Sequence, residues 1–393
     1  MSAFALSPDT RRLALEGPFL LESGAVLPRV EIAYRTWGAL SHDADNAVIV
    51  CHALTGSADA DAWWTPLIGS DRALDPMHDF IVCSNVLGGC YGTTGPSSLA
   101  PDGRPWEERF PRVTLRDQVN AQIALADALG VRGIRLVIGG SMGGLQALEW
   151  ALLDPARVAA VAAVAASARH SPWCIVWSEA QRMALAADPN NPPLSGLAAA
   201  RAIAMITYRS AGSLDRRFGR ARGAEVFGTR SQAPDDFAAR GWLRHHGNLL
   251  LQRFDAHTYR VLLDAMDTHD LGRGRGELDA VLGNLFQPTL VVSIPSDGLY
   301  VPADQHALAR ALPDAVLADL ESSHGHDGFL IDADRLNPIV RDFRDMIGVQ
   351  RLAPTHAVAG TNPPSRRHDA PLSRPRFLPE SRTSATTAPR PGA

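Results

Sequence analysis

The chain has 393 residues, of which 46% are hydrophobic and 20% charged, a balance typical of a globular protein with a large core. The net charge of −4 and the lack of a basic cluster on any expected helix or strand argue against a nucleic-acid partner. Four cysteines without metal-ligand spacing indicate free buried thiols, no metal site and a cytoplasmic location. The apolar stretches are too short for a membrane span, and charged residues within 1–20 interrupt any signal-peptide core.

The first third of the chain contains apolar runs that end in polar loops. Alternation over 19–39 predicts edge strands, and the continuous apolar runs at 46–51 and 80–83 predict strands that are buried on both faces. The second of these runs enters the glycine-rich loop 85–96, whose length indicates that it is either functional or disordered. Helical spacing over 116–129 predicts a helix.

The stretch 136–150 is the one around which the rest of the chain is organised. Residues typical of a strand lead into Gly139-Gly140-Ser141-Met142-Gly143, and helix-forming residues follow. This is the G-x-S-x-G pattern of a nucleophile elbow, a sharp turn between a strand and a helix that presents a serine hydroxyl. The alternative is a tight glycine turn with an incidental serine. The strand-then-helix context favours Ser141 as a nucleophile, which requires a histidine and a carboxylate elsewhere.

The alternation of strands and helices predicts an α/β fold with a mostly parallel, doubly wound sheet. Residues 1–170 would form the first part of this core and 286–348 the second part, with strands at 289–294 and 316–317. Between them, 171–285 shows one helical pattern after another, and we interpret it as a helical insertion that forms a lid. Residues 349–393 have almost no large apolar side chains, so we expect them to be disordered.

A serine nucleophile on this fold is followed along the chain by an acid and then a histidine. Asp297 comes just after the expected strand at 289–294, so its carboxylate would lie at the same edge of the sheet as Ser141. A turn role is the alternative, since Ser-Asp-Gly is also turn chemistry. Spacing does not separate the two histidines that follow, His324 and His326. The remaining histidines are expected to be surface or structural residues, among them His52, His170, His245 and His246.

An acyl-transfer site also needs hydrogen-bond donors for the oxyanion that develops on the attacked carbonyl. On a nucleophile elbow one donor is the backbone N–H of the residue after the nucleophile, here Met142. The second comes from the loop after an earlier strand, which is the loop at 52–56. Leu54 or a neighbour is expected to supply it.

Several motifs, taken jointly and in order, resemble homoserine O-acetyltransferase over roughly residues 19–347. They are His52–Gly56, Ser84–Ser98, Gly139–Gly144, Ile206–Ser210, Arg253–Ala256, Asp267–Asp270 and Gly325–Leu330. The resemblance implies the α/β-hydrolase fold and transfer of an acetyl group from acetyl-CoA, a co-substrate, to the hydroxyl of homoserine for methionine biosynthesis. It also implies no bound cofactor and a homodimer built through the lid helices.

The resemblance also assigns site residues. The family's catalytic histidine lies in a Gly-His-Asp motif, which selects His326 over His324. Asp327 corresponds to the family's contact for the substrate ammonium, and Arg209 to its contact for the carboxylate. Physically, a zwitterionic amino acid needs one cation and one anion beside its α-carbon, and an arginine binds a carboxylate bidentately.

The chain differs from the family in two places within the expected lid. The loop at 189–195 is shorter, and Trp242 stands where the family usually has tyrosine. The acceptor therefore stays open among homoserine, serine and a deacetylated cephalosporin. The donor stays open between acetyl-CoA and succinyl-CoA, because relatives of the family use either one. The loop Gly88–Gly92 and Gly140 resemble the acetylating homoserine enzymes, which favours acetyl-CoA. An esterase and a non-catalytic binding protein are the alternatives from other classes.

Overall fold

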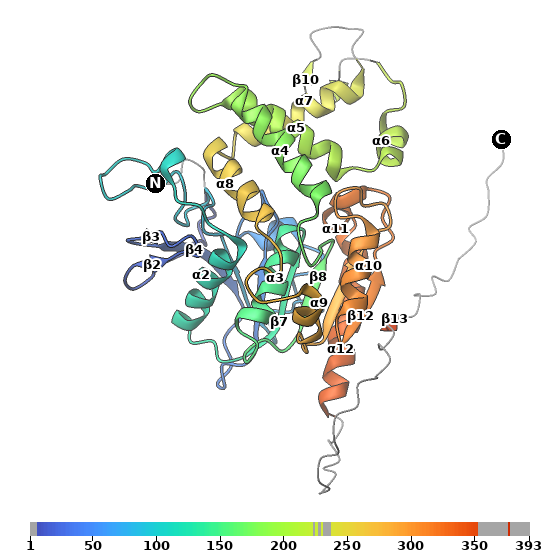
Figure 1. Cartoon of the computed structure of the whole chain (residues 1–393). Helices are drawn as coiled ribbons and strands as arrows, with labels where there is room; N and C mark the ends of the chain where they lie inside the picture. Colours follow the sequence, from blue (N-terminus) through green and yellow to red (C-terminus); the bar gives the residue numbers. More distant parts are fainter. Residues whose placement is uncertain (1–5, 223–224, 227–228, 231–236, 353–375, 378–393) are drawn as a thin grey trace, which may run out of the picture.

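The computed structural model describes residues 6–222, 225–226, 229–230, 237–352 and 376–377 (Figure 1). Within these residues one nine-stranded sheet forms the centre of the fold. Its strands, in spatial order, are β1 (Arg11–Ala14), β4 (Glu31–Trp37), β6 (Phe80–Ser84), β5 (Ala47–Cys51), β7 (Ile134–Gly140), β8 (Val161–Val164), β11 (Thr289–Ser293), β12 (Ala315–Asp319) and β13 (Arg376–Phe377). Strand β4 pairs antiparallel with β1 and β6, and every other pairing in this sheet is parallel.

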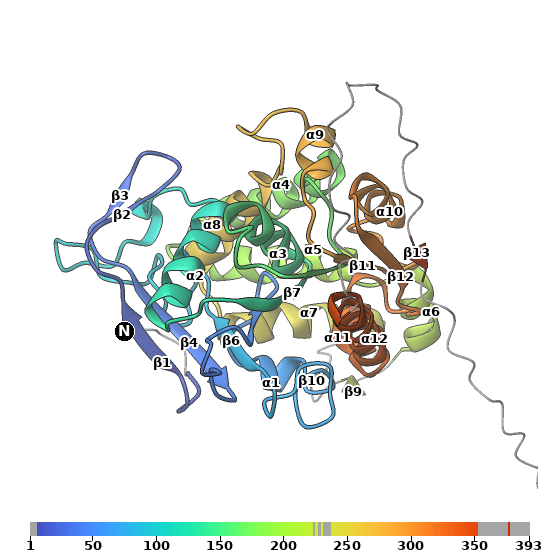
Figure 2. The ribbon, with the colours of Figure 1, turned by 90° about the horizontal axis from the view of Figure 1, so that it is seen from below.

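The parallel strands are buried on both faces, as their continuous apolar runs predict. Every residue of β5, β6, β8 and β11 is buried. Two layers of apolar side chains, one on each face, connect the sheet to its helices. Figure 2 shows α2 (Leu115–Ala128), α3 (Met142–Leu153) and α10 (Pro302–Ala311) on one face, with α1 (Ala60–Trp63) and α12 (Ala333–Leu352) on the other. The predicted α/β fold is confirmed.

In the described part of the segment predicted to be helical, six helices lie between β8 and β11. They are α4 (Pro172–Ala186), α5 (Leu194–Tyr208), α6 (Ala211–Phe218), α7 (Ala238–Leu251), α8 (Ala256–Asp267) and α9 (Leu278–Gly283). Helix α5 packs against α4 and α7, and Figure 1 shows α4 to α8 gathered beyond one end of the sheet. We call residues 171–285 the inserted segment. It also holds two short strands that the sequence did not predict, because two-residue strands carry no periodic signal: β9 (Glu225–Val226) and β10 (Thr229–Arg230).

The remaining short elements lie at the edges of the core. They are β2 (Phe19–Leu20), β3 (Val26–Leu27), the 3₁₀ turns at Glu107–Arg109 and Gly325–Asp327, and α11 (Gly328–Ile331). The expected disorder after residue 348 differs from the structure in two places, since α12 continues to Leu352 and β13 pairs with β12. The other residues of that tail lie outside the described residues. Among the described residues, no helix is both long enough and apolar enough to cross a membrane.

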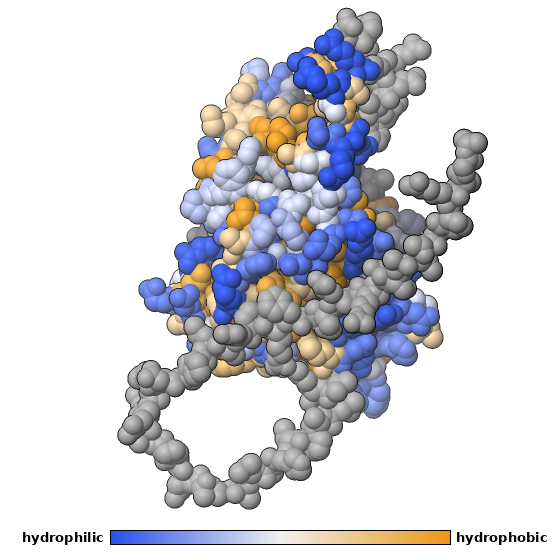
Figure 3. All heavy atoms as spheres, turned by 90° about the vertical axis from the view of Figure 1, so that its right-hand side faces the viewer, coloured by the Kyte–Doolittle hydropathy of each residue, from blue (hydrophilic) through white to orange (hydrophobic). Residues whose placement is uncertain are grey.

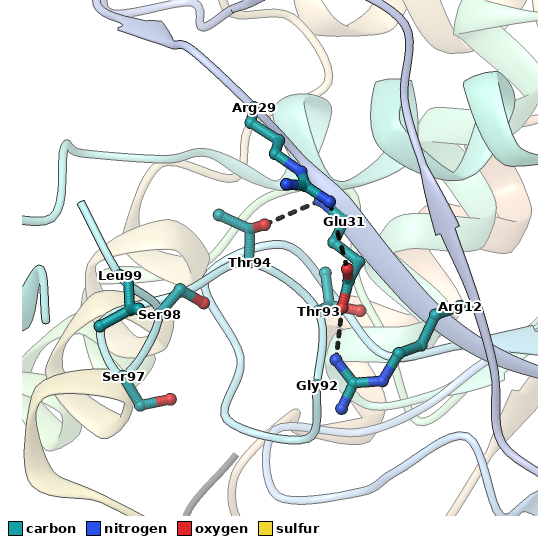
Figure 4. A pocket seen from close by; sticks show the side chains of 9 residues that line it. All are labelled: Arg12, Arg29, Glu31, Gly92, Thr93, Thr94, Ser97, Ser98 and Leu99. Carbon is teal, nitrogen blue, oxygen red and sulfur yellow. Dashed lines mark hydrogen bonds and ion pairs between the residues drawn. The ribbon is translucent and has the colours of Figure 1, made fainter. Parts of the chain in front are cut away.

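The glycine-rich loop 85–96 is ordered. Of the two alternatives given for it, the prediction of disorder is therefore wrong. Two threonines fasten it to β4: the Thr93 hydroxyl accepts from the Ala33 N–H at 2.9 Å, and the Thr94 hydroxyl accepts from the Glu31 N–H at 2.8 Å. Figure 4 shows the hollow of about 240 Å³ beside this junction, in which Arg12 and Arg29 point toward the carboxylate of Glu31. The charged groups of this hollow already pair with one another, and Glu31 also holds Thr94 of the loop. We therefore interpret the hollow as part of the contact between the loop and β4.

Candidate active site

Ser141 lies at the sharp turn between β7 and α3, so the predicted strand-turn-helix arrangement is confirmed. Its φ of 57° is positive, a strained conformation for a residue with a side chain. Gly139 and Gly143, two residues before and after Ser141, cannot carry a side chain, because a Cβ at either position would clash with the backbone. A Cβ added to Gly139 would lie 2.3 Å from the carbonyl carbon of Gly143, and one added to Gly143 would lie 2.0 Å from the Cys51 oxygen.

Asp297 and His326 lie side by side, as the predicted chain order requires. Asp297 comes after β11 and is buried. Its Oδ1 accepts hydrogen bonds from the N–H groups of Leu299 and Tyr300 at 2.8 and 3.0 Å, and its Oδ2 lies 2.8 Å from Nδ1 of His326. A carboxylate held in this way keeps the proton of His326 on Nδ1, so that Nε2 is free to accept one.

The other candidate histidine points elsewhere. Nδ1 of His324 lies 3.4 Å from Nη1 of Arg209. Gly325 separates the two histidines and has a φ of 74°, and a Cβ there would lie 2.6 Å from the Ser210 nitrogen. The turn that only glycine fits therefore aims His324 at Arg209 and His326 at Asp297.

Ser141 and His326 share their neighbours. The rings of Tyr208 and Tyr300 lie 5.7 and 5.5 Å from the His326 ring, centroid to centroid. Both tyrosines line a cavity of about 20 Å³ together with Ser141 and Leu54. Among the described residues no hydrogen bond joins Ser141 to His326, and the buried Nε2 of His326 has no partner there. Catalytic hydrogen bonds are often long before substrate binds, so this geometry fits a resting site.

Two charged neighbours set the pKa of His326. Burial lowers this pKa, but the charge and hydrogen bond of Asp297, together with the charge of Asp327, outweigh burial. The pKa of His326 therefore lies above its ordinary value. Burial in turn raises the pKa of Asp327, against the opposing charges of Arg209 and Arg201.

The predicted oxyanion donors, Leu54 and Met142, have a feature that points to a ligand. Both residues are buried, and neither backbone N–H donates a hydrogen bond to any described residue. Leu54 lines the same cavity as Ser141, and Met142 is the first residue of α3, directly after it. Two free donors beside the serine fit the carbonyl oxygen of an acyl group.

Arg209 and Asp327, predicted to hold the two ends of an amino acid, lie against each other. Arg209 Nε is 3.2 Å from Asp327 Oδ2. Burial lowers the pKa of Arg209, although the charge of Asp327 opposes this effect. The guanidinium also lies 5.9 Å from the ring of Trp242, and both residues line a cavity of about 250 Å³ with His324. Because Asp327 directly follows His326, the pair is next to the His326–Asp297 dyad.

Two of the other histidines are buried structural residues, and a third is a pocket residue that sequence reasoning missed. His52 is buried, accepts from the Val86 N–H at 3.3 Å, and has a pKa that burial lowers to about 4. His269 lies 3.1 Å from the Ser167 carbonyl oxygen. His170, by contrast, lines the cavity of Ser141. Tyr208 and Tyr300 were missed as well. Tyr208 lies within the Ile206–Ser210 motif, but nothing in that motif marks it as a pocket residue, and Tyr300 lies in no motif. Within the described residues, no group of three or more metal-ligating side chains occurs.

The fold and this pocket define the class of protein. A family model described as "alpha/beta hydrolase fold" matches residues 46–193. The structure superposes on the esterase E22 with a TM-score of 0.76 and 24% identity, over 85% of this chain and 100% of that one. It superposes on homoserine O-acetyltransferase from Bacillus anthracis with a TM-score of 0.77 and 21% identity, over 86% and 98% of the two chains. The chain is an enzyme of the α/β-hydrolase fold.

Sequence comparison narrows this class. The chain is 50% identical over 357 residues to homoserine O-acetyltransferase from Nostoc punctiforme, covering 87% of this chain and 98% of the relative. It is 46% identical over 351 residues to the enzyme of that name from Chloroherpeton thalassium, covering 87% and 90%. The chain belongs to the homoserine O-acetyltransferase family.

Proposed function

We propose that this enzyme transfers the acetyl group of acetyl-CoA to the hydroxyl of L-homoserine, giving O-acetyl-L-homoserine and CoA. One observation carries the proposal: the Nε2 of the His326–Asp297 dyad, which has no partner among the described residues, lies beside a partly buried cation–anion pair, Arg209 and Asp327. The dyad and Ser141 supply acyl-transfer chemistry, and the ion pair supplies charges complementary to the two ends of an amino acid.

In the first half-reaction Ser141 attacks the thioester carbonyl of acetyl-CoA. His326 accepts the hydroxyl proton on Nε2 while Asp297 stabilises the imidazolium through Nδ1. The oxyanion forms hydrogen bonds with the N–H groups of Leu54 and Met142. As the tetrahedral intermediate collapses, the carbon–sulfur bond breaks and CoA leaves with the proton from His326, so that acetyl remains on Ser141.

In the second half-reaction homoserine takes the place of CoA. Its carboxylate binds Arg209 and its ammonium binds Asp327, so the ion pair of the resting enzyme opens around the substrate. His326 removes the proton of the homoserine hydroxyl, and the hydroxyl oxygen attacks the carbonyl carbon of the acetyl ester. The bond between this carbon and the Ser141 oxygen then breaks, and His326 gives the proton to Ser141. We propose that the inserted segment 171–285 acts as a lid that excludes water, since water at this step would make the enzyme a hydrolase.

The lining of the Ser141 cavity favours acetyl over succinyl as the acyl group. A succinyl chain would carry a carboxylate into this cavity, which would need a cation there. His170 is the one side chain of this lining that could carry a charge near neutral pH. Burial and the nearby charges of His269 and Arg182 lower its pKa to about 3, so His170 is neutral at pH 7.

Mass spectrometry of the Ser141 peptide tests the donor and the acceptor together. After mixing with acetyl-CoA we expect an acetyl group on Ser141 that homoserine removes with formation of O-acetylhomoserine. Succinyl-CoA should leave the peptide unmodified under the same conditions. Preferential succinylation would overturn the donor assignment, and CoA release at the same rate without any amino acid would identify a hydrolase.

Replacing Arg209 with alanine is expected to raise the KM for homoserine by about 10- to 100-fold, because a charge-assisted contact to the substrate carboxylate is lost. The burst of CoA release that accompanies Ser141 acetylation should persist. Arg209→Lys should recover part of the affinity, since the charge remains and the bidentate geometry does not. Arg310→Ala removes an exposed arginine of α10 and serves as the control. Loss of the burst in Arg209→Ala would contradict the role.

The raised pKa of His326 predicts how the first half-reaction depends on pH. The base must be neutral, so the rate of Ser141 acetylation should fall as pH decreases through the pKa of His326. Asp327→Asn removes one charge that raises this pKa, so the acid limb should move to lower pH. Stopped-flow measurement of the CoA burst without homoserine isolates this effect from acceptor binding. An unchanged limb in Asp327→Asn, or the same displacement in the control Asp332→Asn, would contradict it.

We also propose a cytoplasmic homodimer built through the inserted segment. The four cysteines are free and buried, which fits a reducing compartment. Helix α4 exposes Trp173, Val176 and Met183 at 49%, 57% and 64%, on one side of the helix. On the face in Figure 3, apolar side chains also reach the surface in the upper part, where the inserted segment lies. A second copy would cover the α4 patch, so Val176→Asp should shift the mass measured by light scattering toward the monomer.

A further inference from the structure

A second histidine, His170, lies at the base of the inserted segment and contacts the active site. It is buried, and its Nδ1 lies 3.0 Å from the hydroxyl of Tyr300. Its Nε2 lies 3.5 Å from Oδ1 of Asp267 and 3.5 Å from the hydroxyl of Ser178. None of these contacts takes part in the steps proposed above.

The partners of His170 determine which of its nitrogens carries the proton. Burial raises the pKa of Asp267, and its pair with Arg182 at 2.6 Å opposes this effect by favouring the carboxylate, which is an acceptor. The proton of a neutral His170 consequently belongs on Nε2, which faces Asp267, and Nδ1 is left to accept. Burial keeps the pKa of Tyr300 well above its usual range, so its hydroxyl is protonated and donates to Nδ1.

Tyr300 connects this histidine to the proposed catalytic residues. Its backbone N–H donates to Oδ1 of Asp297, and its ring lies 5.5 Å from the ring of His326 with an angle of 35° between them. It also lines the cavity of Ser141. A tyrosine that is anchored at its hydroxyl and packed along its ring restricts the rotation of the imidazole beside it.

We propose that His170 is a positioning residue, which acts through the hydroxyl of Tyr300 to hold the His326 ring in line with Ser141. This inference rests on the proposed function, since it gives His326 the role of base. Asp267 and Ser178 orient His170 from α8 and α4, so helices of the inserted segment help to set the geometry of the base. The proposed steps assign no role to the Asp267–Asp270 motif. In this proposal its first residue, Asp267, orients His170.

His170 lies between two cavities, so replacing it could also change how water reaches Ser141. One side of the residue lines the Ser141 cavity, and another lines an outer groove of about 660 Å³ with Arg112, Arg169 and Arg273. The imidazole therefore forms part of the wall between the acyl-carrying serine and the groove. A variant that keeps this volume isolates the positioning effect from the entry of water.

Three variants test the proposal. Tyr300→Phe removes only the hydroxyl, and His170→Leu removes both ring nitrogens while it keeps much of the volume. Each is expected to lower kcat by about 10- to 100-fold, because small misplacements of a base are costly. The KM values for acetyl-CoA and homoserine should stay within about twofold. The double variant should be no slower than the slower single variant, since both changes break the same link.

Two further variants separate positioning from stability. Tyr259→Phe is a matched control, because the Tyr259 hydroxyl is also buried and bonded within the inserted segment, to Gln181 at 2.6 Å. It should lower the melting temperature by about as much as Tyr300→Phe and leave kcat unchanged. His170→Gln keeps an amide oxygen that can accept from Tyr300, so it should recover most of the rate lost in His170→Leu.

The same series distinguishes the possible failures. Acetylation of Ser141 in the unmodified enzyme is measured first, and its absence would overturn the proposed function. If that step occurs and Tyr300→Phe keeps its full rate, the positioning role of His170 is wrong. Multiplicative rate losses in the double variant, or a change confined to KM, would also overturn it. Because Tyr300→Phe is almost isosteric, the test stands even where His170→Leu does not fold.

Discussion

Ser141→Ala is expected to abolish acyl transfer, lowering kcat by roughly 10⁴- to 10⁶-fold, since it removes the hydroxyl that we propose carries the acetyl group. No acetyl group should appear on the peptide that contains residue 141. The change removes one oxygen and keeps the Cβ. Because the backbone already holds a residue with a Cβ at a φ of 57°, the fold should persist. Circular dichroism and the melting temperature check this point.

A control and a contrary result sharpen that test. Ser195→Ala removes an exposed hydroxyl at the start of α5 and should leave kcat unchanged. If Ser141→Ala kept more than about a tenth of the activity, transfer would have to proceed directly between acetyl-CoA and homoserine. A residual rate far below this level would come from the oxyanion donors and substrate binding alone.

Asp297→Asn is expected to lower kcat by about 10⁴-fold with little change in shape. The asparagine oxygen can still accept from the N–H groups of Leu299 and Tyr300. Its amide group, however, would donate toward Nδ1 of His326, which forces the imidazole proton onto Nε2. That tautomer cannot accept the proton of Ser141, so both half-reactions fail together.

Steady-state and burst kinetics distinguish this result from general damage. Asp304→Asn, a half-buried acid on α10, is the matched control and should retain its burst. In Asp297→Asn the burst and the turnover should fall by the same factor. A burst that survived at its full rate would show that Asp297 does not orient the base.

Much of the fold could be predicted because its strands carry a strong local signal. The runs at 47–51 and 80–83 are apolar without interruption, as is typical of strands buried on both faces. The contact between Asp297 and His326 could be predicted as well, since the carboxyl ends of parallel strands meet at one edge of the sheet. Strands as short as β9, β10 and β13 carry no such signal.

The rest of the site depends on contacts between distant elements. Spacing could not separate His324 from His326, because the positive φ of Gly325 is what turns them apart. Arg209 and Asp327 were assigned by resemblance, and their contact joins the end of α5 to a turn far along the chain. Tyr300 and His170 carry no motif at all, and only the folded chain brings their side chains together.

The two unpaired N–H groups at Leu54 and Met142 have a thermodynamic consequence. A donor in a protein interior stabilises the fold more when it is paired with a fixed acceptor than when it is paired with water. The carbonyl oxygen of an acetyl group on Ser141 would be such an acceptor. The acetylated form should therefore unfold at a higher temperature than the free enzyme, and substitutions that stabilise the empty pocket by pairing these donors should slow turnover.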